Sequence, residues 1–97
     1  MSYLTQFHPA IRKDLRRINP RAREDILLSV LPELQKDPYI GTLLTGPLRG
    51  IYKYRIFISG VWYRIAYSID SECREIIVLA IGARGEFYDR LSRRLGK

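Results

Sequence analysis

The hydrophobic pattern is most regular in the two stretches that flank Ser59 and Gly60. Residues 51–58 and 61–67 are rich in aromatic and β-branched side chains and alternate between apolar and polar positions. Alternation with a period of two is typical of a half-buried β-strand. Because glycine readily adopts a positive φ, Ser59-Gly60 fits the two-residue loop of a β-hairpin. The pattern therefore predicts a hairpin in which Ile58 lies opposite Val61.

This register assigns each side chain of the hairpin to one of two sheet faces. The first face is apolar throughout and is predicted to point into the core, with the opposed pairs Ile56/Tyr63, Tyr54/Ile65 and Tyr52/Tyr67. The second face carries the pairs Phe57/Trp62, Arg55/Arg64 and Lys53/Ala66. We interpret the aromatic pair on the second face as a stabilising cross-strand contact rather than as a platform for a base.

The segment before residue 20 predicts a short strand and a first helix. Residues 3–7 alternate as in a strand, and His8 follows them as the only histidine. We expect His8 to be a strand-end residue rather than a ligand or a catalyst. Apolar residues then recur at helical spacing at Ile11, Leu15 and Ile18, with basic residues away from that stripe.

A second helix is predicted to follow at once and to form an αα-hairpin with the first. Asn19 is expected to cap it, with Pro20 in its first turn. Its apolar stripe runs from residue 22 to residue 34, and Pro32 within that stripe is expected to kink or break the helix. The Asp37-Pro38 pair should end the segment, because a residue before proline avoids the α region.

The rest of the chain completes an α+β fold. Residues 37–50 are punctuated by Gly and Pro and are interpreted as a connection. Residues 76–82 form a nearly continuous apolar run, typical of a strand buried on both faces, and residues 86–95 can form one short basic helix. We therefore expect a single domain, residues 1–97, with an N-terminal strand, an αα-hairpin, an antiparallel three-stranded meander and a short C-terminal helix.

The net charge of the chain narrows the class of molecule that it is expected to bind. The chain has 17 Lys and Arg against 10 Asp and Glu, for a net charge of +7 and a pI near 9.9. This balance favours a polyanionic partner, nucleic acid ahead of a membrane surface, although an acidic protein partner remains open. Cys73 is the only cysteine, so an internal disulfide and a cysteine-based zinc cluster are excluded. We expect no metal, no cofactor and no membrane association, and a cytoplasmic location.

The opposition of Arg55 and Arg64 is the strongest candidate for function. Like charges directly opposite one another destabilise an antiparallel pair. No Asp or Glu occurs between Asp37 and Asp70, so no acidic residue nearby in sequence offsets these cations. A solvated basic strand face remains the alternative. We favour an anion site, most plausibly for phosphate, because the arginine fork matches phosphate oxygens.

The motifs in the second half resemble those of the RelE/ParE toxin superfamily of toxin–antitoxin systems, and most closely its RelE branch. They are Leu-Arg-Gly at 48–50, Tyr-Lys-Tyr-Arg at 52–55, Tyr-Arg-Ile-Ala-Tyr at 63–67, Ile-Gly-Ala-Arg at 81–84, and Tyr88. The resemblance implies a ribosome-dependent endoribonuclease that cleaves mRNA and is held inactive by an antitoxin protein. It places functional residues at Arg49, Lys53, Arg55, Arg64, Arg84 and Tyr88.

The resemblance also suggests roles in the attack of a ribose 2′-OH on the adjacent phosphate, which needs a proton acceptor, charge stabilisation and a proton donor. Lys53 is the cation of this set that can release a proton, whereas Arg49, Arg55 and Arg64 would hold phosphate oxygens. Arg84 would protonate the leaving oxygen, although an arginine acid is chemically demanding. Tyr88 would stack a base or orient the 2′-OH, or would instead close the edge of the core.

One residue departs from the RelE pattern, and two other functions remain open. RelE toxins often have lysine at both strand positions, whereas the second position here is Arg55, which weakens its assignment as a proton acceptor. A ParE-like toxin would inhibit DNA gyrase with the same fold and no nuclease site. A third alternative is a protein of this fold that only binds an antitoxin or RNA.

Overall fold

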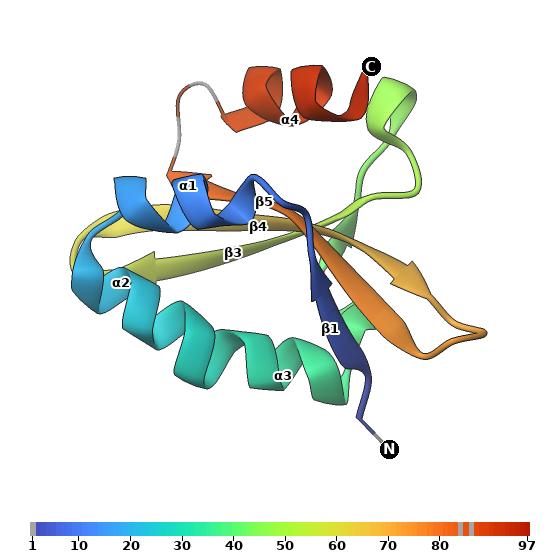
Figure 1. Ribbon diagram of the computed structural model, residues 1–97, viewed down its shortest axis with the longest axis horizontal. Helices are drawn as coiled ribbons and strands as arrows, with labels where there is room; N and C mark the ends of the chain where they lie inside the picture. The colour runs from blue at the N-terminus through green and yellow to red at the C-terminus, as the bar shows by residue number, and fades with distance from the viewer. Residues whose placement is uncertain (1, 84, 86) are drawn as a thin grey trace.

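The computed structural model describes residues 2–83, 85 and 87–97. The chain begins with strand β1 (Leu4–Phe7), helix α1 (Ile11–Arg17), and a second helix made of α2 (Pro20–Asp25), a π-helical stretch η1 (Ile26–Val30) and α3 (Leu31–Lys36). It continues with a 3-10 turn η2 (Pro38–Ile40), strand β2 (Thr42–Leu43) and a second 3-10 turn η3 (Gly46–Leu48). Strands β3 (Tyr52–Ile58), β4 (Val61–Asp70) and β5 (Glu75–Ala83) follow, and the last element is helix α4 (Phe87–Leu95) (Figure 1).

The strands form one sheet in the order β1-β5-β4-β3-β2. β3, β4 and β5 make the predicted antiparallel meander, and β1 pairs in parallel with β5. The α+β class and the order of the predicted elements are therefore confirmed. No helix in the described part of the chain has the length and apolar character needed to cross a membrane.

The sheet is covered on its two faces by different helices (Figure 1). Helices α1, α2 and α3 cover one face and enclose the main core, in which Ile26, Leu34, Ile65 and Tyr67 are fully buried. Helix α4 lies against part of the other face, where Phe87 and Leu91 join Ala66, Leu79 and Ala80 in a second cluster. Strand β5 contributes to both clusters, which explains its nearly continuous apolar sequence.

The hairpin has the predicted register at all seven pairs from Tyr52/Tyr67 to Ile58/Val61. Ser59 and Gly60 both have positive φ, at 50° and 81°, as a two-residue turn that follows the twist of the strands requires. The predicted inner face packs on the helices, with Tyr63 and Ile65 buried. The alternation of residue types was therefore sufficient to place both faces.

The second helix continues past Pro32 instead of breaking. Asn19 caps its start by accepting a hydrogen bond from Arg21 N–H at 2.8 Å, as predicted. Before the proline the helix widens into the π-helical stretch, where Leu31 N–H donates to the carbonyl of Ile26. A π-helical turn inserts an extra residue into the helix, and here it absorbs the irregularity that proline imposes. Asp37 ends the helix, also as predicted.

The connection over residues 37–50 contains more structure than its sequence indicated. Thr42 and Leu43 pair with Lys53 and Tyr52 as an edge strand, which gives the sheet a fifth member. Two residues are too few to show a period, so the pattern of the sequence could not reveal this strand.

Tyr67 ties this connection to the core. Its side chain is fully buried, and its hydroxyl donates a hydrogen bond of 2.6 Å to the carbonyl of Pro38. A side chain at Gly41 would collide with that hydroxyl, so glycine is needed there. Burial raises the pKa of Tyr67 to about 12, because the phenolate would lose its hydration.

We expect Tyr67→Phe to weaken the fold near neutral pH but to reduce its sensitivity to alkali. The loss near neutral pH should be about 1–3 kcal/mol, because the Pro38 carbonyl is left buried without its donor. In the wild type, the raised pKa means that this contribution is fully present below about pH 10 and is lost as pH rises towards 12. Urea denaturation at neutral and alkaline pH measures both effects, and Tyr54→Phe on the same sheet face controls for loss of a hydroxyl. An unchanged alkaline response in Tyr67→Phe would contradict the assignment.

Candidate functional site

The cations singled out in the sequence share the sheet face that points away from helices α1 to α3. Arg55 lies opposite Arg64, and Arg64 lies opposite Gly82 on the next strand. Lys53 lies one row along, opposite Ala66. Because side chains alternate along a strand, Lys53, Arg55 and Arg64 project from one face. We call these three residues the cationic row.

Helix α4 brings an aromatic ring to the cationic row. Tyr88 lies in its first turn, and the Nζ atom of Lys53 is 5.8 Å from the centroid of the Tyr88 ring. The neighbouring Phe87 is buried in the second cluster, whereas more than a third of Tyr88 is exposed. Phe87 therefore closes the core, and the Tyr88 ring lies partly exposed beside Lys53.

Arg64 has unused hydrogen-bonding capacity. Its Nε and Nη1 atoms are buried from solvent and have no hydrogen-bond partner among the residues that the structure describes. A buried guanidinium N–H without an acceptor is destabilising, and a charged acceptor would relieve that cost. An oxyanion such as phosphate has the charge and the several oxygens that this arrangement lacks.

The other predicted site residues have different surroundings. Arg55 is exposed, and its guanidinium carbon lies 4.8 Å from the centroid of the Trp62 ring. Lys53 and Arg55 line a mostly polar hollow of about 300 Å³ at the edge formed by β2 and β3. Arg49 is exposed just after η3, with its N–H bonded to the carbonyl of Gly46. Arg84 lies outside the described residues.

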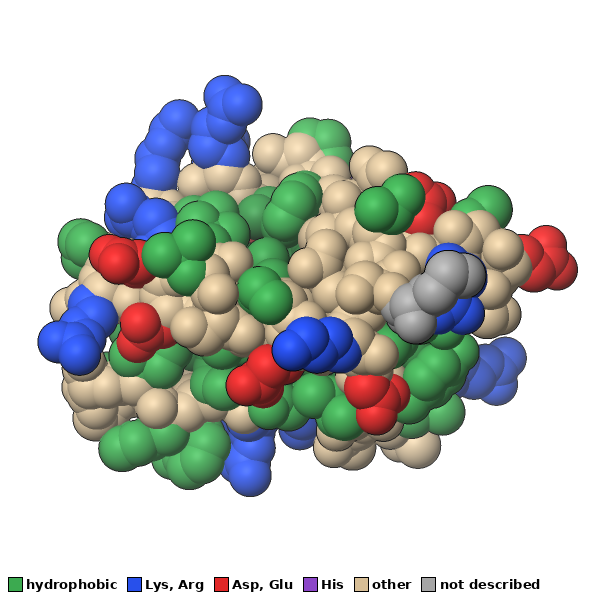
Figure 2. Space-filling view, turned by 90° about the horizontal axis from the view of Figure 1, so that it is seen from below, with side chains coloured by type: hydrophobic (Ala, Val, Ile, Leu, Met, Phe, Trp, Pro, Cys, Tyr) green, Lys and Arg blue, Asp and Glu red, His purple; other side chains and the backbone are tan. Residues whose placement is uncertain are grey.

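The helix layer carries charges of both signs, whereas the stretch that holds the cationic row carries only cations. The stretch between Asp37 and Asp70, which includes the cationic row, has no acidic residue. Figure 2 shows the molecule from the side of α2 and α3, where acidic, basic and hydrophobic side chains are mixed. The basic residues of the αα-hairpin, from Arg12 to Arg23, belong to this helix layer, and Arg23 donates to the carbonyl of Leu15. One of them, Arg17, reaches the edge of β5, where it lines a cavity with Gly82 and Arg90.

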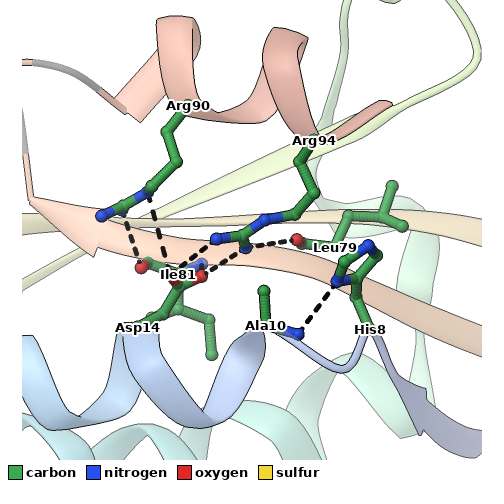
Figure 3. Close-up of polar contacts among 7 residues, drawn as sticks. All are labelled: His8, Ala10, Asp14, Leu79, Ile81, Arg90 and Arg94. Atoms are coloured by element: carbon green, nitrogen blue, oxygen red, sulfur yellow. Dashed lines mark hydrogen bonds and ion pairs between the residues drawn. The ribbon is translucent and has the colours of Figure 1, made fainter. Parts of the chain in front are cut away.

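A buried carboxylate that the sequence analysis missed holds α4 in place. Asp14 on α1 is completely buried. Arg94 on α4 donates to both of its oxygens, at 2.7 and 3.0 Å (Figure 3). Such a two-pronged pair is the strongest form of the carboxylate–arginine contact.

Three side chains, Asp14, Arg90 and Arg94, satisfy the open edge of β5. Past Val78, β5 has no partner strand on the side of β1, and the Ile81 N–H donates to Asp14 at 3.0 Å. Arg94 donates to the carbonyl of Leu79 and Arg90 to that of Ile81, at 2.9 and 3.1 Å. We call Asp14, Arg90 and Arg94, with the β5 backbone between them, the edge clamp.

Small residues make room for the clamp. A Cβ atom at Gly82 would collide with the guanidinium of Arg90. A cavity of about 330 Å³ lies beside the clamp and is lined in part by Asp14, Arg17 and Arg90, but not by the cationic row. One signal in the sequence could have revealed the clamp, because Asp14 falls at helical spacing between Ile11 and Ile18, on the stripe predicted to be buried.

Among the described residues, Asp70, Cys73 and Glu75 form a group with ligand atoms within 4.8 Å of one another. They lie at the turn between β4 and β5. The charge of Asp70, a hydrogen bond to it and the charge of Glu75 all contribute to raising the pKa of the Cys73 thiol. This favours the protonated form, which is a poor metal ligand and a poor nucleophile. The absence of a metal from the function stays a prediction.

His8 has the structural role expected of it. Its ring Nδ1 accepts a hydrogen bond from the Ala10 N–H at 3.0 Å (Figure 3). Its backbone N–H donates to the carbonyl of Val78 and so extends the pairing of β1 with β5. The imidazole therefore fixes the turn between β1 and α1.

The geometry of the site can be compared with known proteins. The sequence profile of the ParE-like toxins of type II bacterial toxin–antitoxin systems matches residues 5–92. A comparison with curated proteins finds no match.

Solved structures share the fold. The RelBE2 toxin–antitoxin complex of Mycobacterium tuberculosis contains a chain with a TM-score of 0.76 and 27% identity, over 87% of this chain and 100% of that one. A double mutant of the Escherichia coli toxin RelE in the free state has a TM-score of 0.74 and 23% identity, over 98% and 99% of the two chains. A chain of the archaeal RelE–RelB complex from Pyrococcus horikoshii has a TM-score of 0.61 and 23% identity, over 88% and 98%.

We expect Arg94→Met to destabilise the protein by about 3–5 kcal/mol, because it leaves the Asp14 carboxylate buried without its main partner. The double variant Asp14→Leu/Arg94→Met should recover part of that loss, since no buried charge remains, although Ile81 N–H loses its acceptor. The exposed Arg93 on the same helix provides the control, and Arg93→Met should change stability by less than about 0.5 kcal/mol. Urea denaturation gives the three values. If Arg94→Met and Arg93→Met are equally stable, the Asp14–Arg94 ion pair does not hold α4 in place.

Proposed function

Because the chain belongs to the ParE-like toxin family of type II bacterial toxin–antitoxin systems, we propose that it is a ribosome-dependent endoribonuclease that cleaves mRNA. The observation that carries this proposal is Arg64, whose two buried N–H donors have no acceptor in the described structure and lie opposite a second arginine. Such donors fit a charged acceptor that a bound partner supplies. A phosphate in the reacting RNA would satisfy them.

The cationic row, together with Arg84 and Arg49, supplies the roles that this reaction needs. Arg64 and Arg55 hold the oxygens of the scissile phosphate and stabilise the charge that grows on them as the 2′-OH attacks. Lys53 accepts the proton of that hydroxyl. Arg84 donates a proton to the leaving 5′-oxygen, and Arg49 adds a more distant phosphate contact.

Tyr88 lies next to the proposed proton acceptor, since its ring centroid is 5.8 Å from the Nζ atom of Lys53. A base stacked on the exposed Tyr88 ring would bring the attached ribose close to Lys53.

Inhibition of DNA gyrase is the second candidate, favoured by the profile that matches the chain, since it describes ParE-like toxins. Such an inhibitor would need neither Lys53 nor unpaired donors on Arg64. Induction in cells separates the two functions. In-frame cuts in translated mRNA would support the nuclease, whereas double-strand DNA breaks without mRNA cuts would support the inhibitor.

An antitoxin is the expected protein partner, and the helix layer offers it a surface. An apolar groove of about 380 Å³ lies between β1, α1 and η1, lined by residues that include Phe7, Ile11 and Leu27. Leu4 and Leu28 are exposed on the elements that form this layer. An amphipathic helix with acidic residues would match both the groove and the basic residues of α1. Two of the similar structures described above are themselves complexes, the RelBE2 toxin–antitoxin complex and the archaeal RelE–RelB complex.

Replacing the arginines of the site should abolish toxicity without unfolding the protein. We expect Arg64→Ala and Arg84→Ala to permit normal growth on induction, because each removes a charge that acts on the reacting phosphate. Arg64→Ala should keep or increase stability, since it deletes two buried donors without acceptors. Growth assays and thermal denaturation of the purified variants test this. Full toxicity would remove these residues from the site, and unfolding would point to a structural role.

A lysine base can be separated from a lysine that only holds phosphate. We expect Lys53→Met to lower the single-turnover cleavage rate on ribosomes by about 10²–10⁴-fold while changing binding much less. The rise of the wild-type rate with pH should be absent in this variant. Arg55→Lys is the matched control and should be tolerated, because it keeps a cation at the neighbouring position. If Lys53→Met loses affinity and rate in parallel, the lysine acts as a phosphate clamp and another group takes the proton.

A further inference from the structure

Two aromatic side chains at the tip of the β3–β4 hairpin are much more exposed than their size would suggest. Phe57 is 58% exposed and Trp62 is 42% exposed, although both lie in regular strands. Their ring centroids are 5.1 Å apart and the rings are tilted by 54°, so the rings touch but do not hide one another. The pair stabilises the hairpin, as its sequence predicted, yet it leaves a large apolar surface in contact with water.

This surface lies next to the cationic row and on the same face. On this face, Phe57/Trp62 is the next pair after Arg55/Arg64. The Arg55 guanidinium sits on the Trp62 ring, which places a cation in contact with the aromatic surface. From Lys53 to Phe57 the strand advances four residues, or about 13 Å. Cations and aromatic rings therefore follow one another along a single strip.

An exposed aromatic pair beside arginines has the chemistry of a site for single-stranded nucleic acid. Every base has a flat π face that can stack on an aromatic ring, while arginine neutralises the adjoining phosphate. Single-stranded RNA is recognised mainly in this way, because its bases are free to splay out. The lack of Asp and Glu between residues 38 and 69 means that no acidic residue of this stretch repels the RNA backbone.

The sequence favoured a stabilising role over a base platform for this pair, but its exposure and its contact with Arg55 support a different assignment. We propose that Phe57 and Trp62 form a stacking platform for one unpaired base of single-stranded RNA, with Arg55 holding the phosphate between that base and the cationic row. The platform rests on the proposed function, since it extends the same strip of the same face. It gives the cationic row a second point of attachment for the substrate, so the register of the RNA is fixed on both sides of Arg55. The apolar groove of the helix layer, on the other side of the sheet, remains for protein contact.

Trp62 is the only tryptophan of the chain, so its fluorescence reports on the platform alone. The probe is a short single-stranded oligoribonucleotide with 2′-O-methyl groups, which cannot be cleaved through the 2′-OH, titrated into the full chain. We expect the oligonucleotide to quench the emission of Trp62 as a base stacks on the ring. Inorganic polyphosphate, which has the charge but no bases, should bind without this quenching.

Variants then measure the contribution of the rings. Trp62→Ala and Phe57→Ala should each lower the affinity for the oligonucleotide by about 5- to 100-fold. Trp62→Phe keeps an aromatic face and the contact with Phe57, so its affinity should stay within about 3-fold of the wild type. Tyr39→Ala removes an exposed aromatic side chain from η2, outside this strip, and should leave affinity unchanged. If Trp62→Ala does not fold, Phe57→Ala and the wild-type quenching decide the question.

The outcomes separate the platform from the nuclease. Quenching by the oligonucleotide without cleavage on ribosomes would support the platform and reject the proposed function. Cleavage on ribosomes, with wild-type rates and oligonucleotide affinities in Trp62→Ala and Phe57→Ala, would reject the platform and keep the nuclease. Quenching by polyphosphate equal to that by RNA would also reject stacking. If Trp62 responds only to a bound acidic antitoxin, the aromatic pair is a protein contact and the platform is wrong.

Discussion

Past Val78, strand β5 has no neighbouring strand on the side of β1, and the backbone groups of Leu79 and Ile81 on that edge need other partners. An unpaired edge inside a protein is costly, because each buried N–H or C=O without a partner loses its bond to water. Here the partners are the side chains of Asp14, Arg90 and Arg94. The carboxylate that accepts from the strand is itself neutralised by an arginine, so burial of its charge is tolerated. The position of α4, and with it Tyr88, depends on this arrangement.

Two arginine environments in the molecule illustrate the difference between stability and function. In the edge clamp, Arg94 has acceptors for its guanidinium in Asp14 and in the β5 backbone. On the sheet face, Arg64 has two buried donors without acceptors in the described structure and faces another cation. The first arrangement lowers the free energy of the fold and the second raises it. A protein retains an arginine such as Arg64 where a bound ligand supplies the missing acceptors.

Much of the fold and the positions of the cationic row could be predicted, because they depend on residues that lie close together in the sequence. A two-residue turn fixes the register of its hairpin, so Ser59-Gly60 was enough to place Arg55 opposite Arg64 and Phe57 opposite Trp62. The edge strand at Thr42 was missed because two residues have no period. The clamp was missed because its pairing joins residues that lie 80 positions apart, and no local pattern connects them. Tyr88 was expected from the resemblance, but its contact with Lys53 depends on how α4 docks and could not be derived from spacing.

The separation between Asp14 and Arg94 also affects how the chain folds while it is being made. During translation β1 and α1 are synthesised first, and the Asp14 carboxylate then has no arginine of α4 to neutralise it. The nascent N-terminal part must therefore keep this side chain hydrated, and α1 cannot settle against β5 in its final form. Contacts of high sequence separation close late and slowly. The completed arrangement of α1, β5 and α4 thus belongs to the last stage of biosynthesis, and a ribosome stalled before Arg94 would carry an incompletely folded protein.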